Sequence, residues 1–178
     1  MIINRELLIK YAPIINMKDT KIREHGFSWG MSEAGYDIRI AQDIQFYPQQ
    51  KHTVRFWKNK PAQIIRWGRN AEWHDPIING NFCLASSIEA FDMPNNLVGI
   101  VHDKSTWARK GLSVFNTVIE PGWNGFLTLE LVFNGSEPLE ILSGTGIAQV
   151  VFHATSNIAS YNGKYQNQEN KPQEALYD

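Results

Sequence analysis

Apolar and polar residues alternate along much of this chain. The segment Tyr36–Phe46 (YDIRIAQDIQF) shows the clearest alternation, and a period of two residues is typical of a half-buried strand. Further short segments of strand character are, in chain order, Asn81–Phe91, Leu97–His102, Gly125–Phe133, Leu139–Leu142 and Ile147–Phe152. Turn-forming residues such as Asn134 and Gly135 separate these segments. Many short strands with such turns predict a mainly β fold, as a sandwich, a barrel or a jelly roll.

Helical patterns are confined to two short segments. Asn4–Tyr11 predicts a first helix, with Asn4 as a candidate N-cap and Pro13 ending it. Ser105–Lys110 predicts one internal helical turn, with Ser105 at its N-cap. We therefore expect helices to contribute little to this fold.

Two segments depart from the β pattern. From Ser156 onward the sequence is polar, so we expect a mobile tail over about residues 156–178 that acts as a lid. The segment Lys51–Asp75 is rich in Trp, Lys and Arg and is compatible with a hairpin or with a long excursion from the core. No internal repeat or linker interrupts the sequence, and its 178 residues suit a single domain spanning 1–178.

Composition and charge exclude several classes of protein. The net charge of -1 argues against bulk nucleic-acid binding, which needs a basic face, so any anion site must be local. The single cysteine, Cys83, excludes an intramolecular disulfide framework and a thiolate-rich zinc site, and it fits the reducing cytoplasm. No apolar run approaches the roughly 20 residues that span a bilayer. The N-terminal segment also lacks the basic region and cleavage site of a signal peptide.

A small group of cationic and hydroxyl side chains follows the segment Leu97–His102. Lys104, Ser105 and Thr106 are consecutive, and Arg109 lies four residues after Ser105, so it shares a helical face with that serine. An ammonium, two hydroxyls and the N–H groups of a helix start are suitable ligands for phosphate. A capped surface helix with a solvated Lys and Arg would show the same local pattern, and the residues alone do not separate the two interpretations.

A single carboxylate interrupts the apolar segment 126–133 (FLTLELVF). Strand periodicity puts Glu130 on the same face as Phe126, Thr128 and Val132. Burial among these residues would raise its pKa into a range useful for a general base or general acid. The alternative is an exposed acid on the solvated face of an antiparallel strand, which is the commoner outcome for such a residue.

Other charged residues indicate structural roles, and several known chemistries are excluded. Asp37 and Arg39 alternate with apolar residues, either as an ion pair or as solvated edge charges, and a structural role is favoured. The sequence lacks the zinc-deaminase signature, the HExxH zinc motif, the P-loop and the GxSxG nucleophile elbow.

Five blocks of sequence, in order, resemble the dCTP deaminase branch of the dUTPase-like superfamily. They are GYDIRIA (35–41), SSIEAFDMPNNLVGIVHDKSTWARKGL (86–112), VIEPGWNGFLTLEL (118–131), GIAQVVFH (146–153) and SYNGKYQNQ (160–168). The likeness covers roughly two thirds of the chain, and chance agreement across five ordered blocks is small.

This resemblance implies a distorted jelly-roll, or β-clip, dUTPase-like fold with short helices, in a homotrimer with active sites at subunit interfaces. It implies hydrolysis of dCTP to dUTP and ammonia without zinc, with Mg²⁺ bound through the triphosphate. Glu130 would be the general base, with Ser105 and Arg109 at the reacting base and the phosphates. The other substrate-binding residues that it implies are Lys104, Thr106, Glu120, Thr128, Leu129, Tyr161, Lys164 and Gln168. Zinc normally generates the hydroxide in nucleobase deaminases, so a carboxylate base is the route that remains.

Departures from the family pattern leave alternatives open. Lys104 stands where Arg is usual, Thr106 where Ser is usual, and Glu120 where Asp is usual. The segment between Arg109 and Pro121 is about two residues shorter than usual, which affects the loop around the base. A bifunctional enzyme that gives dUMP and pyrophosphate stays open, as does a nucleotide-binding protein without turnover. Inhibition by dTTP and a preference for modified cytosine nucleotides also stay open.

Overall fold

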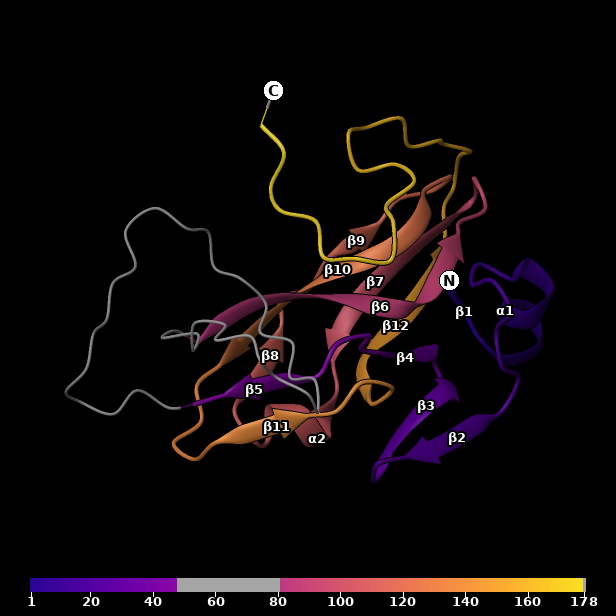
Figure 1. Cartoon of the computed structure of the whole chain (residues 1–178). Helices are drawn as coiled ribbons and strands as arrows, with labels where there is room; N and C mark the ends of the chain where they lie inside the picture. Colours follow the sequence, from indigo (N-terminus) through magenta and orange to yellow (C-terminus); the bar gives the residue numbers. More distant parts are fainter. Residues whose placement is uncertain (48–80, 178) are drawn as a thin grey trace.

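The computed structural model describes residues 1–47 and 81–177, which form a mainly β fold (Figure 1). The strands are β1 (Ile2–Ile3), β2 (Lys21–Glu24), β3 (Phe27–Met31), β4 (Tyr36–Arg39), β5 (Ile44–Phe46), β6 (Phe82–Asp92), β7 (Leu97–Asp103), β8 (Leu112–Val114), β9 (Val118–Ile119), β10 (Asn124–Phe133), β11 (Leu139–Ile141) and β12 (Gly146–Ala154). The helices are α1 (Arg5–Tyr11) and α2 (Ser105–Ala108). The predicted mainly β fold with short helices is therefore confirmed. None of the helices in this part of the chain is long and apolar enough to cross a membrane.

The strands of the described residues form three antiparallel sheets. The largest has seven strands, in the order β2-β3-β4-β12-β7-β9, with β1 added on β12. A second sheet has the order β6-β10-β8, and β11 pairs with β5. The tryptophan-rich segment Lys51–Asp75, between β5 and β6, lies outside the described residues.

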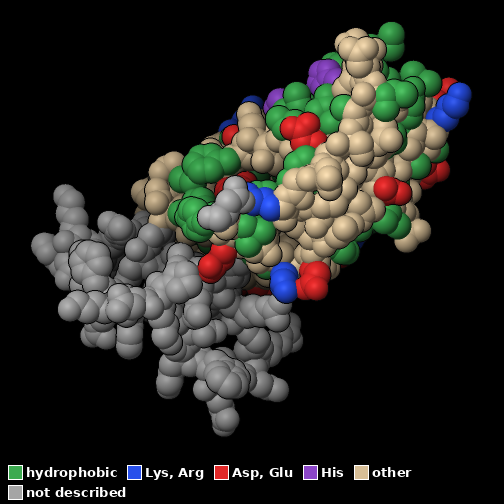
Figure 2. Space-filling model, turned by 90° about the horizontal axis from the view of Figure 1, so that it is seen from above, with side chains coloured by type: hydrophobic (Ala, Val, Ile, Leu, Met, Phe, Trp, Pro, Cys, Tyr) green, Lys and Arg blue, Asp and Glu red, His purple; other side chains and the backbone are tan. Residues whose placement is uncertain are grey.

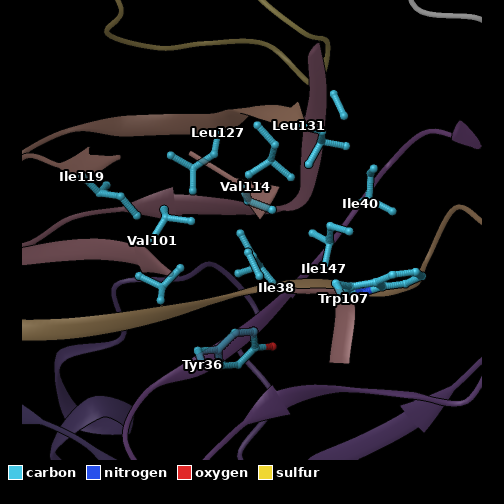
Figure 3. Packing of buried hydrophobic residues seen from close by; sticks show 14 of the residues in the cluster. Tyr36, Ile38, Ile40, Val101, Trp107, Val114, Ile119, Leu127, Leu131 and Ile147 are labelled. Atoms are coloured by element: carbon cyan, nitrogen blue, oxygen red, sulfur yellow. The ribbon is translucent and has the colours of Figure 1, made fainter. Parts of the chain in front are cut away.

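The hydrophobic core lies between the largest sheet and the three-stranded sheet (Figure 3). Figure 3 shows Ile38 of β4 across this layer from Leu127 and Leu131 of β10. Along β10, every second side chain is buried and those between are half-buried. The alternation predicted for Gly125–Phe133 is thus confirmed, and the outer face of β10 is left available for a site.

The alternating segment Tyr36–Phe46 is two strands rather than the one expected. β4 ends at Arg39 and pairs with β12 in the largest sheet. β5 begins at Ile44 and pairs with β11, so it belongs to another sheet. Within β4, Asp37 is as deeply buried as its apolar neighbours, so the prediction of a half-buried strand is wrong here. Asp37 has hydrogen-bonding partners inside the protein, and these offset the cost of burying its carboxylate.

Both predicted helices are present, with small differences at their ends. Asn4 occupies the N-cap position of α1, but its amide donates to the Glu33 carbonyl (2.8 Å) instead of capping the helix. The helix ends at Ala12, in the left-handed conformation (φ 46°), before the proline that follows. The N-cap of α2 is Lys104, so the prediction of Ser105 at that position is wrong by one residue.

The segment from Ser156 folds back over β10, where Gly125 bridges to Gln168, and its mobility as a lid stays a prediction. In Figure 1 it is drawn in yellow, passing across β10. Phe126 N donates to Gln168 O (3.0 Å), which joins the segment to the strand. Gly125 allows this approach because a Cβ at that position would lie 2.6 Å from Gln168 N. Seen from above, charged side chains are scattered between hydrophobic and uncharged polar ones (Figure 2).

Candidate active site

A cavity of about 550 Å³ lies between β10, β9, β6 and the C-terminal segment. Its wall is largely apolar, with contributions from Phe82, Val118 and Trp123. Polar side chains that line it include Glu120, Thr128, Glu130, Tyr161, Gln168, Gln173 and Glu174. An apolar cavity with a few converging polar groups is the usual form of a small-molecule site. The first five of these polar residues are among the site residues predicted from the sequence.

Glu130 is placed by the alternation of β10. Leu129 and Leu131 on either side of it point into the core, so Glu130 faces the cavity. Its cross-strand neighbour is the apolar Leu84 of β6, which also lines the cavity. Burial raises the pKa of Glu130 above the ordinary value of a glutamate, and a backbone hydrogen bond partly opposes this rise. A half-buried carboxylate of raised pKa is suited to accept a proton and to return it.

Thr128 and the C-terminal segment close one side of the cavity. The Thr128 hydroxyl accepts a hydrogen bond from Gln173 N (2.9 Å). The Tyr165 carbonyl accepts one from the Trp123 indole (2.7 Å), so the segment is held at two points of the cavity wall. Tyr161 is tied to the turn before β10, because its N–H donates to the Pro121 carbonyl (2.8 Å).

Six of the predicted substrate-binding residues do not line this cavity, and Leu129 and Lys164 are two of them. Leu129 is 1% exposed and faces the core, so its side chain lies on the opposite face of β10 from Glu130. Lys164 donates to the Leu176 carbonyl and lies 5.8 Å from the Tyr165 ring. Its ammonium is therefore near the end of the chain rather than in the cavity.

The phosphate-type ligands predicted from the sequence lie apart from the cavity. They are Lys104, Ser105, Thr106 and Arg109, and none of them lines it. All but the lysine are exposed, whereas the Lys104 ammonium is ion-paired with Asp37. Figure 1 shows α2 at the lower end of the molecule, away from the C-terminal segment. The predicted site residues thus occupy two regions of the chain.

Asp37 and Arg39 do not pair with each other, and they are not solvated edge charges. Arg39 Nε donates to Glu89 Oε1 (2.8 Å), and the guanidinium lies 3.7 Å from the centroid of the Trp29 ring. Burial raises the pKa of Glu89, and its hydrogen bonds with Arg39 oppose the rise. The structural role favoured from the sequence is confirmed, but each residue has a different partner from the one considered.

Several lining residues were not singled out from the sequence. Trp123, Tyr165, Gln173 and Glu174 all line the cavity. The last three lie in the C-terminal segment, where polar composition gave no sign of a packed structure. Trp123 follows the Pro121-Gly122 turn, and its place in the block 118–131 (VIEPGWNGFLTLEL) was the one signal that could have identified it.

The carboxylates of the cavity do not form a metal centre by themselves. In the described ranges, 1–47 and 81–177, no three His, Cys, Asp or Glu side chains are grouped as metal ligands. Glu120, Glu130 and Glu174 line the same cavity without converging on one point.

Comparison with known proteins places the chain in a family. It is 32% identical over 171 residues to a dCTP deaminase of Campylobacter concisus, covering 93% of this chain and 90% of that protein. It is 37% identical over 148 residues to a dCTP deaminase of Neisseria meningitidis, covering 79% of this chain and 77% of that protein. The native dUTPase of EIAV superposes with a TM-score of 0.49 at 16% identity, over 86% of this chain and 93% of that one. The family model described as dCTP deaminase-like matches residues 14–155, and the chain belongs to the dCTP deaminase-like family.

Proposed function

We propose that this protein hydrolyses dCTP to dUTP and ammonia, with Glu130 as the general base. The observation that carries the proposal is the position of Glu130, a half-buried carboxylate of raised pKa in an apolar cavity. Membership of the dCTP deaminase-like family supports the choice of substrate. The reaction belongs to pyrimidine deoxynucleotide metabolism, as a source of dUTP.

Glu130 would transfer one proton in two steps. As a carboxylate it accepts a proton from water while the water oxygen bonds to C4 of the cytosine ring. It then returns that proton to the 4-amino group, the C4–N bond breaks, and ammonia leaves. Glu130 thereby activates the attacking water, which in zinc-dependent nucleobase deaminases is activated by the metal through a lowered pKa of the bound water. Its half-burial suits this cycle because burial raises the pKa of the carboxyl group, which makes its carboxylate a stronger base than that of an exposed glutamate.

The triphosphate needs positive charge that this cavity does not provide. Its ionisable lining groups are acids and tyrosines, whereas Arg109 is exposed on α2 with Ser105 and Thr106. We propose that α2 of a neighbouring copy completes each cavity, so that the active sites lie at subunit interfaces. A head-to-tail contact of this kind closes into a ring, and the family resemblance makes that ring a homotrimer.

The C-terminal segment would serve as the lid over bound nucleotide. Tyr161 and Gln168 already line the cavity, and Lys164 lies between them in the chain. Mg²⁺ would enter with the substrate, bound by its triphosphate oxygens. The proposed catalytic unit is thus a single domain over residues 1–178, with its lid at about 156–178. The free thiol of Cys83, which is buried with its pKa raised to about 12, is compatible with a cytoplasmic protein.

The direct test is a product assay on purified protein with dCTP and Mg²⁺. Ammonia and pyrophosphate are measured in the same reaction, and the nucleotide product is identified. The proposal requires ammonia and dUTP without pyrophosphate. Ammonia together with pyrophosphate and dUMP would make the enzyme bifunctional. The absence of ammonia would reject the proposal. If the enzyme is active, addition of dTTP tests inhibition by the end product.

A further inference from the structure

The proposed reaction gives no role to the buried carboxylate of Asp37. This residue lies in the GYDIRIA block on β4 and is 3% exposed. Its Oδ2 atom accepts hydrogen bonds from Ser28 Oγ (3.1 Å) and from the Lys104 ammonium. Its Oδ1 atom accepts one from Gln149 Nε2 (3.1 Å). Four segments distant in sequence therefore meet at one buried charge.

Lys104 is held from the inside of the protein. Its side chain is only 11% exposed. Besides its bond with Asp37, its ammonium donates to Ser28 Oγ (3.2 Å). An ammonium has three donors, and two of them are directed inward. At most one remains for a phosphate, in contrast to the exposed guanidinium of Arg109.

Lys104 also determines where α2 begins. It is the N-cap residue of this helix, and a helix of four residues has no stability of its own. The helix is fixed at a second point by Trp107, whose indole donates to the Gly146 carbonyl (2.8 Å). The Trp107 ring also stacks on Phe27, with 4.0 Å between the centroids. The Asp37 ion pair and Trp107 together hold the exposed residues of α2.

We propose that Asp37 is a positioning residue for the triphosphate ligands. By holding the Lys104 ammonium, it sets the orientation of Ser105, Thr106 and Arg109. Lys104 then acts chiefly as the counter-ion of Asp37. This inference rests on the proposed function for the identity of the ligand, but the contacts that carry it are independent of the reaction.

The first test measures the order of α2 without any reaction. Amide hydrogen exchange over residues 105–110 is compared between the wild type, Asp37→Asn and Lys104→Met. Asn keeps the size of Asp37 but removes its charge, so we expect faster exchange at α2 in both variants. The matched control is Glu33→Gln, which removes the exposed ion pair between Glu33 and Lys21 (2.8 Å). Exchange at α2 that stays at the wild-type rate in Asp37→Asn would overturn the proposal.

The second test separates positioning from folding stability by kinetics. We expect Asp37→Asn to raise KM for dCTP about tenfold, which corresponds to ~1.4 kcal/mol of binding free energy, with kcat little changed. Arg109→Ala should then cost less in KM in the Asp37→Asn background than in the wild type, since Arg109 is already displaced. A purely structural role would lower the unfolding temperature and leave the cost of Arg109→Ala equal in both backgrounds.

A second variant and the exchange measurement separate a failure of this proposal from a failure of folding or of the proposed function. If Asp37→Asn does not fold, Ser28→Ala removes two hydrogen bonds of the same network, one with Asp37 and one with Lys104, without removing a charge. It should give the same changes at reduced size. An unchanged KM and unchanged exchange in Ser28→Ala would count against the proposal. If the wild type releases no ammonia from dCTP, the proposed function fails, whereas the exchange measurement still decides the role of Asp37.

Discussion

The cavity beside β10 and the exposed face of α2 differ in charge and in how they are built. The cavity has Glu120, Glu130 and Glu174 in its lining, and the C-terminal segment of the same chain covers one side of it. Arg109, the C-cap residue of α2, is exposed, and α2 is held by contacts with residues distant in sequence. The cavity has a base without phosphate ligands, whereas α2 has phosphate ligands without a base. Under the proposed function, each region would supply half of the nucleotide site.

The largest effect should come from removing the base in the cavity. Glu130→Gln keeps the shape of the side chain but cannot accept the proton of water. We expect kcat to fall by about 10²–10⁴-fold, the usual contribution of general acid–base catalysis, while dCTP still binds. Steady-state rates and calorimetric binding check this. Turnover at the wild-type rate would remove Glu130 from the mechanism.

Truncation after Ile158 removes the cover of the cavity and should have the next largest effect. The lost residues include Tyr161 and Gln168 in the lining and Gln173, which bonds to Thr128. We expect KM for dCTP to rise by roughly 10–100-fold, the scale of losing one or two hydrogen bonds to a charged ligand. An unchanged KM would show that the C-terminal segment has no part in substrate binding.

Gly125→Ala tests the docking of the same segment with a single methyl group. The new Cβ would lie 2.6 Å from Gln168 N, and Gly125 has a φ of 139° that disfavours a side chain. The segment must move away from β10, so we expect a rise in KM smaller than that of the truncation, together with faster proteolysis after residue 156. Gly26→Ala is a matched control, because Gly26 also has a positive φ but no atom lies within 4 Å of its added Cβ.

The pH profile should report the burial of Glu130. The base works as a carboxylate, so kcat/KM should fall as the pH drops through its pKa. Because burial raises that pKa, the midpoint of the acid limb should lie above about 4.3, the ordinary value of a glutamate. A limb at or below the ordinary value would mean that another group controls the rate.

The smallest expected effect is on stability. When the pKa of a carboxyl group is higher in the folded than in the unfolded state, the protein loses stability as the pH rises through the folded-state pKa. At neutral pH, Glu130→Gln should therefore raise the unfolding temperature, by roughly 1–3 °C since the group is half-exposed. The gain should disappear as the pH falls below about 4.3, the ordinary pKa of a glutamate, since Glu130 then becomes protonated in both states. A lower unfolding temperature at neutral pH would contradict the assigned environment.

Local pattern predicted the parts of the site that depend on one strand. Alternation in 125–133 gave the face on which Glu130 lies, because Leu129 and Leu131 must enter the core. Alternation did not reveal that Tyr36–Phe46 would divide between two sheets, since the choice of partner strand lies far away in sequence. The short strands β1, β2, β3, β8 and β9 were missed for a similar reason, because two to five residues carry too little periodicity.

Long-range contacts explain what the sequence could not predict about the site. The polar C-terminal segment packs because β10 offers it backbone partners, which its own composition does not show. Lys104 was predicted as a phosphate ligand, and its pairing with Asp37 depends on a contact across 67 positions. Such partners are chosen by the fold as a whole, so no local pattern reports them.

The most direct test of the account is subunit complementation, with ammonia release from dCTP as the readout. Glu130→Gln lacks the base of the cavity, and Arg109→Ala lacks the exposed cation of α2. Each variant alone should be nearly inactive at low dCTP. If α2 of one subunit completes the cavity of another, mixing the unfolded variants in equal amounts and refolding them restores both halves at roughly a quarter of the interfaces. Recovery of activity on mixing is the predicted result, and a mixture no more active than its components would contradict the account.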